Sequence, residues 1–556
     1  MINIDSLSIK AFLAENIDFF IGARVQKIQQ PNRREIILNL RNKGESRKLY
    51  LNINPSFYHI CFMSKENELK RNIKNPKAPA MFCMLLRKYL DGAKIVSVEQ
   101  PEFERIFEIY FEYYDALNEK IKLCLAVELM GKHSNIILYN YDTNVIIGCA
   151  HNVGSEKSKD RELQGLLPYM YPPRQDKYDI REMSFGDFFE LLKKEKNWQG
   201  FLVQNFHYIT KSLIDTLLSE LNISQSYTES QLKQLYSVLI DLIELKIIFP
   251  CIDKEFCQFS LYPFKNALKS NSVSDMFDEY FAYHQNLKLV KNLKDKILVQ
   301  INNQIKKLEN LKEKQSEQLK KEDKMLIYKK KGDILMANLH KILPEIQKLI
   351  LDDFEGNLVE IELDNMLSPV ENANRYYKLY KKSKTSVEHN RNLFEETQNR
   401  LGYYAEQKFY AQIAHSIEDL EEIFAEITDD SLLQKRQTKE KNISLNPIVI
   451  EGYKIFVGKN SAQNDYILSK LASPEDIWFH PLNFAGSHVV LKKNNSKEIV
   501  SDDILFKAAK ISKEYSVGKS ASKVPIVYTL RKYVKKGNSK KQAFVTYKNE
   551  TEILVD

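Results

Sequence analysis

The segment IKLCLAVELMGKHSNIIL at residues 121–138 decides how the N-terminal part of the chain folds. A strand-like run at 121–127 enters a polar segment, and an apolar run at 136–138 leaves it. Gly131 supplies the positive φ that such a reversal often requires. Considered alone, the reversal is more simply a solvated turn than a ligand-binding edge. We predict a β-hairpin with these polar side chains at its end: Glu128, Lys132, His133, Ser134 and Asn135.

Alternation of apolar and polar residues continues around this hairpin. Residues 1–177 therefore form one predicted α/β domain, which Pro168, Pro172 and Pro173 close. Its expected strands are 24–30, 35–41, 48–53, 59–62, 94–99 and 105–113, and its expected helices are 5–20 and 80–90.

The remaining sequence is too long to share a single core, because the chain has 556 residues. Residues 178–275 are predicted to be mostly helical. Apolar residues then step by three or four through 276–330 and again through 385–427, with charged residues between them. This pattern predicts two antiparallel helices of a coiled-coil arm around a small tip domain at 331–384. An ordinary helical bundle is the alternative.

The last part of the chain has a different composition. A polar segment at 428–446 without periodicity is a predicted linker. Residues 447–556 combine strand-like runs with one helical segment, which predicts a compact α+β domain. The expected fold class of the whole chain is therefore multidomain α+β.

Positive charge is concentrated in this last domain. Residues 443–556 contain 18 Lys and Arg against 11 Asp and Glu, a net +7 out of +8 for the chain. Such an excess favours a polyanion as partner. A run without acids at 531–541 has the clustering that phosphate neutralisation requires, although a solvated basic loop has the same composition. Its basic residues are Arg531, Lys532, Lys535, Lys536, Lys540 and Lys541.

Aromatic and imidazole side chains precede the basic run. Trp478, His480 and His488 are of the types that stack on or hydrogen-bond to RNA. Core packing is the preferred explanation for Trp478, and for the two histidines both explanations stay open. The predicted RNA-binding residues of this domain are His480, His488, Arg531, Lys532, Lys535 and Lys536.

Several classes of function lack their sequence signals. The six cysteines include no CxxC pair, and no Cys/His cluster has zinc-ligand spacing, so neither a metal nor a cofactor is expected. No P-loop, GxSxG, HExxH or dinucleotide-binding fingerprint occurs, so no catalytic residues are predicted. The N-terminus has no signal-peptide pattern, and no apolar run reaches membrane-spanning length. We therefore expect a cytoplasmic protein with reduced thiols and no membrane partner.

Several segments in a fixed order resemble the NFACT family, which includes bacterial RqcH and eukaryotic NEMF. The resemblance covers essentially the whole chain. It implies an N-terminal NFACT domain, a helix-hairpin-helix-type region, a coiled-coil arm with a middle domain, and a C-terminal NFACT-R domain that binds RNA. The matching segments are 81–88, 128–138, 367–373, 458–465, 476–491 and 522–525.

This resemblance also implies a function in ribosome-associated quality control. Such proteins bind large ribosomal subunits, through rRNA and near the stalk proteins, when a nascent chain joined to tRNA obstructs them. They recruit tRNA, which is expected here to be alanine-specific, and support C-terminal tailing without mRNA. The tail marks the stalled chain for degradation. Because the ribosome performs peptide transfer, the protein is expected to position tRNA and not to be an enzyme.

Two family motifs identify the expected tRNA site. An Asp-Arg pair of the family aligns with Glu104-Arg105, where the acid is one methylene longer, so a ribosome binder that has lost tailing is a further alternative. From its residue types, this pair is either a surface salt bridge or a phosphate contact. A Glu-(Ile/Leu)-Met motif matches Glu128-Leu129-Met130. The predicted tRNA-binding residues are Glu104, Arg105, Glu128, Leu129, Met130, Lys132 and His133.

Two other functions compete with this one. The N-terminal domain resembles the fold of formamidopyrimidine DNA glycosylases, which use an N-terminal Pro followed by Glu. Ile2 and Asn3 occupy those positions here, so neither glycosylase activity nor a DNA partner is expected. The family has also been described as fibronectin-binding, which makes an extracellular matrix adhesin the alternative. The missing signal peptide argues against that alternative.

Overall fold

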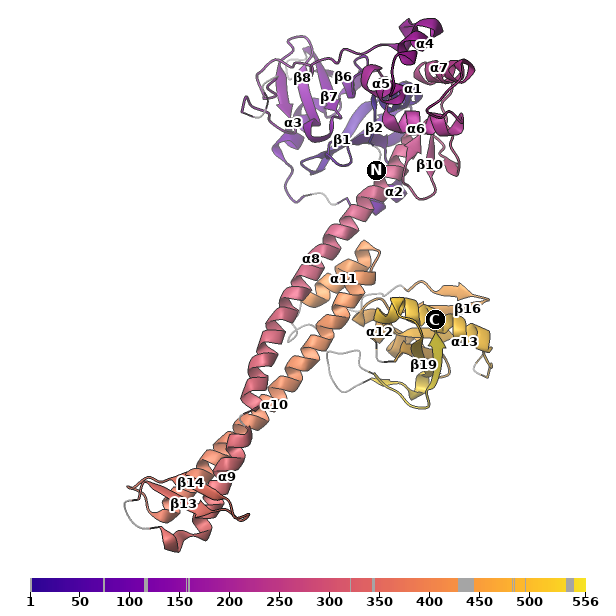
Figure 1. The fold of residues 1–556 in the computed structure, drawn as a ribbon. Coiled ribbons are helices and arrows are strands. Elements are labelled where there is room, and N and C mark those ends of the chain that lie inside the picture. The colour runs from indigo at the N-terminus through magenta and orange to yellow at the C-terminus, as the bar shows by residue number, and fades with distance from the viewer. Residues whose placement is uncertain are drawn as a thin grey trace. The chain divides into compact units, whose positions relative to one another are not determined.

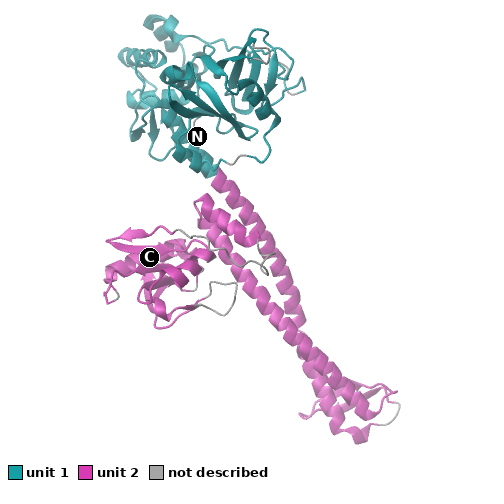
Figure 2. Ribbon diagram, turned by 180° about the vertical axis from the view of Figure 1, so that it is seen from behind, with its two compact units in different colours: residues 1–288 teal, residues 289–556 magenta. Residues whose placement is uncertain are grey.

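The computed structural model divides the chain into two compact units, Met1–Lys288 and Leu289–Asp556 (Figures 1 and 2). Lys540 and Lys541 of the basic run lie outside the described residues. The structure describes all residues except 1–2, 74–75, 115–118, 157, 159–160, 321, 343–345, 429–444, 483, 485, 496 and 537–544.

An antiparallel sheet forms the centre of the first unit. In the described part of this unit, its strand order is β4-β3-β2-β1-β5-β6-β7-β8-β9. The hairpin predicted from the sequence is present, because β7 and β8 pair with Glu128 opposite Asn135. A 3₁₀ turn at Gly131–His133 joins them, and Gly131 has a φ of +64°. The strands are β1 (Arg24–Asn32), β2 (Glu35–Asn42), β3 (Glu45–Asn52), β4 (His59–Phe62), β5 (Lys94–Glu99), β6 (Ile106–Tyr114), β7 (Lys120–Glu128), β8 (Asn135–Asn140) and β9 (Ile146–Cys149).

Helices of the first unit share one hydrophobic core with this sheet. Asp5 caps α1 by accepting a 2.8 Å hydrogen bond from the Ser8 amide. Phe12 of α1 packs against Phe107 of β6 and Phe277 of α8 (Val273–Leu319). The start of α8 is therefore part of this core. The other helices are α1 (Ser6–Phe20), α2 (Lys65–Lys70), α3 (Met81–Leu90), α4 (Phe185–Lys193), α5 (Trp198–Asn205), α6 (Lys211–Glu220) and α7 (Glu229–Ile243).

The region predicted to be helical also contains a small sheet. Three short strands pair in the order β11-β10-β12, at Phe259–Ser260, Cys251–Asp253 and Ala267–Lys269. Residues 178–275 were predicted to be mostly helical, and α4 to α7 lie there, whereas these three short strands were not predicted. Strands of two or three residues are too short to show an alternating pattern.

Long helices dominate the start of the second unit (Figure 2). After α8 come α9 (Glu322–Ala337), the hairpin of β13 (Lys348–Asp352) and β14 (Leu358–Glu362), and then α10 (Pro369–Ile413). Ile297 and Ile301 of α8 are buried in one cluster with Tyr404 and Tyr410 of α10. The helices thus form the expected helical arm, with the hairpin between them.

The arm helices differ from their predicted bounds. The returning helix begins at Pro369 instead of 385, and it ends at Ile413 instead of continuing to 427. A separate helix, α11 (Ile417–Thr428), follows the break. Ser368 and Glu371 form a capping box, which fixes the early start of α10.

A second antiparallel sheet organises the C-terminal domain, in the order β15-β16-β18-β17-β19-β22. Helix α13 (Asp502–Glu514) packs with Phe479 on one face of the sheet. Trp478 belongs to the core on the other face, with Ile467 and Leu468, which follow α12 (Ser461–Tyr466). The strands are β15 (Ile448–Ile450), β16 (Tyr453–Val457), β17 (Ile477–Pro481), β18 (Val489–Lys492), β19 (Val524–Leu530) and β22 (Thr551–Val555), and β20 (Lys535–Lys536) pairs separately with β21 (Val545–Thr546).

Two kinds of feature do not occur among the described residues. Across the described ranges, no helix is both long and apolar enough to span a bilayer. In the same ranges, His, Cys, Asp and Glu side chains do not gather in groups of three or more that could hold a metal ion.

Candidate nucleic-acid interface

The two motifs predicted to bind tRNA lie side by side at one edge of the first sheet. Ile106, the first residue of β6, pairs with Glu128, the last residue of β7. Beyond this pair, the Leu129 amide donates a 2.8 Å hydrogen bond to the Arg105 carbonyl oxygen. Sheet register therefore brings Glu104-Arg105 next to Glu128-Leu129-Met130, although more than twenty residues separate the motifs in sequence.

Glu128 is held inside the protein. Its two carboxylate oxygens accept hydrogen bonds from Arg161 at 2.7 and 2.5 Å, and Tyr169 donates a third at 3.0 Å. The glutamate is 0% exposed, as is Leu129. Burial, followed by the Glu128 charge, raises the pKa of the Tyr169 hydroxyl. The expectation that Glu128 and Leu129 contact RNA directly is corrected: their side chains fix the end of β7 and the main chain next to Arg105.

Arg105 is half-buried and accessible from this edge. Its Nη1 donates to the Tyr58 hydroxyl at 3.3 Å. Burial lowers the pKa of Lys177, and the Arg105 charge lowers it further, so the two cations are close enough to interact. Asp5 lies within electrostatic range of Arg105, but burial raises the pKa of the Asp5 carboxyl. The guanidinium thus belongs to a partly desolvated cationic site, which suits a phosphate or a carboxylate.

Glu104 lies within electrostatic range of the cations Arg105, Arg174 and Arg161. Its main chain is fixed, because its amide donates to Pro101 at 3.0 Å and its carbonyl accepts from Gln100 at 2.8 Å. Among the described residues, no hydrogen bond or ion pair holds the carboxylate. Burial raises its pKa, and the charges of Arg105 and Arg174 offset part of that rise. The pair is therefore not the closed salt bridge that the sequence left open.

A strained loop supports the pair from the other side. Phe103 has a φ of +66°, which is uncommon for a large residue and costs free energy unless neighbours hold it. Its ring stacks on His207 with centroids 3.8 Å apart, and Arg181 lies over the ring at 5.8 Å. Arg181 also pairs with Glu102 at 2.8 Å. No local sequence signal indicates the His207 contact, because the two rings are about a hundred residues apart.

The hairpin end combines structural and exposed residues. The Ser134 hydroxyl accepts a 2.8 Å hydrogen bond from the Met130 amide, and the Asn135 side chain donates to the His151 carbonyl at 2.8 Å. Lys132 and His133 are exposed on the 3₁₀ turn, and Met130 is half-buried. The structure thus leaves Lys132 and His133 available to a ligand, whereas Ser134 and Asn135 stabilise the turn.

The histidines of the C-terminal domain are more enclosed than expected. His488 is 3% exposed and lies edge-on to His480, with ring centroids 5.5 Å apart. His480 stacks parallel to Trp478 at 5.6 Å. Burial lowers the pKa of His480 to about 4 and that of His488 well below its usual value, so both are neutral at pH 7. The expectation that His488 offers an RNA-binding surface is corrected: it is a core residue beside Trp478, which the sequence already assigned to packing.

The basic run divides into structural and exposed cations. The Arg531 guanidinium donates to the carbonyl oxygens of Leu468 and Val534, at 2.5 to 2.9 Å, and therefore joins the helical turn Ile467–Leu471 to the end of its own turn, Arg531–Tyr533. Lys532 pairs with Glu475 at 2.9 Å on the surface. Lys535 is exposed and begins the two-residue strand β20, and Lys536 is the last residue of that strand. Arg531 is thus committed to the fold, while Lys535 remains free to meet a polyanion.

Comparison with known families covers nearly the whole chain. Residues 5–445 match the model described as NFACT N-terminal and middle domains. Residues 448–546 match the model described as the NFACT protein RNA binding domain. The second match covers β15 to β19 and the basic run, and it ends before β22, the edge strand of the six-stranded sheet.

Individual relatives agree with these matches. The Rqc2 homolog RqcH of Streptococcus suis is 30% identical over 550 residues, covering 96% of this chain and 94% of that protein. The protein of the same name from Bacillus subtilis is 30% identical over 559 residues, with the same coverage. The solved N-terminal part of the fibronectin/fibrinogen-binding protein from Streptococcus suis covers 50% of this chain and 99% of its own, at 28% identity and a TM-score of 0.42. A TM-score at that level carries no argument about function.

Proposed function

Because the chain belongs to the NFACT family, we propose that it is a cytoplasmic ribosome-associated quality control factor that binds RNA. Its relatives named Rqc2 homolog RqcH are matched over 94% of their length, so the proposal concerns the whole chain. The net charge of +7 in residues 443–556 supports RNA binding by the C-terminal domain.

The finer proposal concerns tRNA. The protein binds large subunits that are obstructed by a nascent chain joined to tRNA, with contacts to rRNA and to proteins near the stalk. There it recruits tRNA, alanine-specific in this proposal, for C-terminal tailing without mRNA. The ribosome supplies the peptidyl-transfer chemistry, and the protein supplies position.

One observation carries the tRNA part of this proposal. The hydrogen bond from Leu129 to Arg105 unites the two motifs at a sheet edge, beside the exposed turn with Lys132 and His133. Arg105, Lys132 and His133 can contact phosphates there, whereas Glu128 acts by positioning the main chain through Arg161. Phosphate contacts of this kind fix the register and orientation of an RNA.

The test of the general proposal is co-sedimentation with ribosomal subunits. Purified protein is mixed with separated large and small subunits at low salt and centrifuged through sucrose. We expect the protein to sediment with the large subunit and to be released as the salt concentration rises. Equal recovery with both subunits, or with neither, would contradict the proposal.

A further inference from the structure

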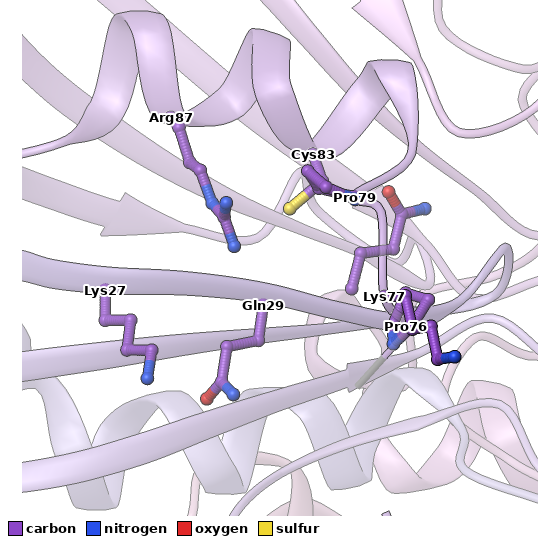
Figure 3. Close-up of a pocket in the computed structure, with 8 residues that line it drawn as sticks. Lys27, Gln29, Pro76, Lys77, Pro79, Cys83 and Arg87 are labelled. Carbon is purple, nitrogen blue, oxygen red and sulfur yellow. The ribbon is translucent and has the colours of Figure 1, made fainter. Parts of the chain in front are cut away.

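A second cationic site, formed by residues other than those of the Arg105 edge, lies in a cavity of about 220 Å³ between β1 and α3. Figure 3 shows Arg87 and Cys83 on the helix, and Lys27 and Gln29 on the facing strand. Lys77 and two prolines complete the described lining together with Gln30. Arg87 and Cys83 belong to the segment 81–88 that resembles the family, yet the proposed function gives this segment no role.

The charged residues described in the lining of this cavity are all basic. Its described lining contains Lys27, Lys77 and Arg87 and no acidic residue. Among the described residues, none of these three cations has an ion-pair partner. The Arg87 guanidinium is held in place, because Nε and Nη2 donate to the Ile28 carbonyl oxygen at 3.0 and 2.8 Å. A fixed guanidinium beside two flexible ammonium groups is an arrangement that binds phosphate.

Gln30 adds a different requirement. It is 5% exposed, and within the described part of the chain its Oε1 has no hydrogen-bond partner. A buried acceptor without a donor costs free energy, so it calls for an explanation. A hydroxyl group on the bound molecule would supply the missing donor.

We propose that this cavity binds a ribonucleotide, with its phosphate on Lys27, Lys77 and Arg87 and its ribose hydroxyl donating to Gln30. The ribonucleotide is either part of an RNA strand or free in solution, since both carry the same two groups. The 2′-hydroxyl is the group by which proteins distinguish RNA from DNA. The RNA-strand form rests on the proposed function, whereas the free-nucleotide form does not.

Photocrosslinking with the full-length protein tests this site locally. A single-stranded RNA containing 4-thiouridine and a DNA of the same sequence containing 4-thiothymidine are irradiated with the protein, and adducts are mapped by mass spectrometry. We expect RNA adducts on peptides covering residues 24–32 or 76–88 and fewer DNA adducts there. If excess AMP suppresses the adducts, a free nucleotide also enters the site. The absence of adducts on these peptides, together with no binding of AMP to the protein by calorimetry, would overturn the proposal.

Substitutions test the role of the cations and the role of Gln30 independently. In the variant Lys27→Ala/Lys77→Ala, the slope of log adduct yield against log salt concentration should become shallower by about 2. Each lysine that is removed leaves one phosphate charge without a neutralising cation. The control Lys233→Ala/Lys254→Ala removes the same charge from exposed positions in the same unit and should leave the yield unchanged. Gln30→Leu should remove the preference for RNA over DNA, provided that thermal unfolding shows a folded protein. Equal yields for both lysine pairs would overturn the proposal.

Co-sedimentation of the same variants keeps this inference distinct from the proposed function. If wild-type protein does not bind large subunits but still gives nucleotide adducts in the cavity, the proposed function fails and the cavity site stands. If binding to large subunits is normal and no adduct or AMP binding is found, only the cavity site fails.

Discussion

The main-chain amide of Leu129 donates a 2.8 Å hydrogen bond to the carbonyl oxygen of Arg105. This bond continues the β6–β7 ladder by one step and ties two separate motifs to one sheet edge. Glu128, the neighbour of Leu129, is anchored from behind by Arg161. The main chain next to Arg105 is therefore held by a largely buried ion pair.

The Glu128–Arg161 pair should be essential for the stability of the first unit. Glu128→Gln removes the charge opposite a guanidinium whose side chain is only 11% exposed. Breaking one partner of such a pair costs about 3 kcal/mol. Urea unfolding should show this loss, and the double variant Glu128→Leu/Arg161→Met should recover most of it.

A more exposed ion pair between β6 and β7 provides the control. Glu112 of β6 pairs with Lys120 of β7 at 2.6 Å, and their side chains are 26% and 46% exposed. Glu112→Gln should change stability very little, because exposed pairs contribute little. If Glu112→Gln and Glu128→Gln destabilise the protein equally, the anchoring role of Glu128 is refuted.

Stability of the second unit should fall as the pH rises. Burial raises the pKa of Glu406 to about 7, and no described residue bonds to its Oε2. Burial likewise raises the pKa of Glu426 to about 7, although hydrogen bonds from Gln407 and the Ala462 amide offset part of the rise. The folded state therefore holds more protons than the unfolded chain between about pH 4.5 and 7, and stability decreases across this window.

Replacing Glu406 should remove its share of this pH dependence. Glu406→Gln should stabilise the protein by about 1 kcal/mol at pH 8 and have little effect at pH 4.5, because the carboxyl is already protonated there. Glu396→Gln, at an exposed position of the same helix, is the matched control. Melting temperatures measured from pH 4.5 to 8.5 provide the readout, and parallel curves for wild type and Glu406→Gln would contradict the assignment.

Glu104 distinguishes two forms of the proposed function. Its carboxylate lies within electrostatic range of Arg105, Arg161 and Arg174, and among the described residues no hydrogen bond or ion pair holds it, so the extra methylene can be accommodated. We expect wild-type protein to support tailing in a reconstituted assay and Glu104→Asp to change the rate less than about tenfold. A wild type without tailing activity that gains it with Glu104→Asp would instead identify a ribosome binder that has lost tailing.

The sequence predicted the first sheet well because its strands are rich in apolar residues and two of its reversals carry a glycine with positive φ, Gly44 and Gly131. It placed the start of α10 too late, although Ser368, Pro369 and Glu371 carry a helix-start signal that was assigned to the tip. It also missed the break before α11. Ile413 and Ile417 keep the helical spacing across that break, so periodicity alone cannot reveal it.

The candidate site was only partly predictable for a different reason. Residue types identified Arg105 and the turn, and the β6–β7 register then brought them together. The burial of Glu128 depends on Arg161, 33 positions away, and no local pattern indicates that partner. Likewise, arginine is a residue type that binds phosphate, but in the folded protein the Arg531 guanidinium donates a hydrogen bond to the Leu468 carbonyl oxygen.

Sequencing the RNA that co-purifies with the protein tests the central claim most directly. Tagged wild type and Arg105→Ala are isolated at low salt from cells in which ribosomes have been stalled. We predict that wild type carries large-subunit rRNA and tRNA enriched in alanine acceptors, whereas Arg105→Ala keeps the rRNA and loses the tRNA. Arg105 is half-exposed, so this variant should remain folded. Wild-type protein that carries neither RNA, or tRNA recovery that is the same with Arg105→Ala, would contradict the account.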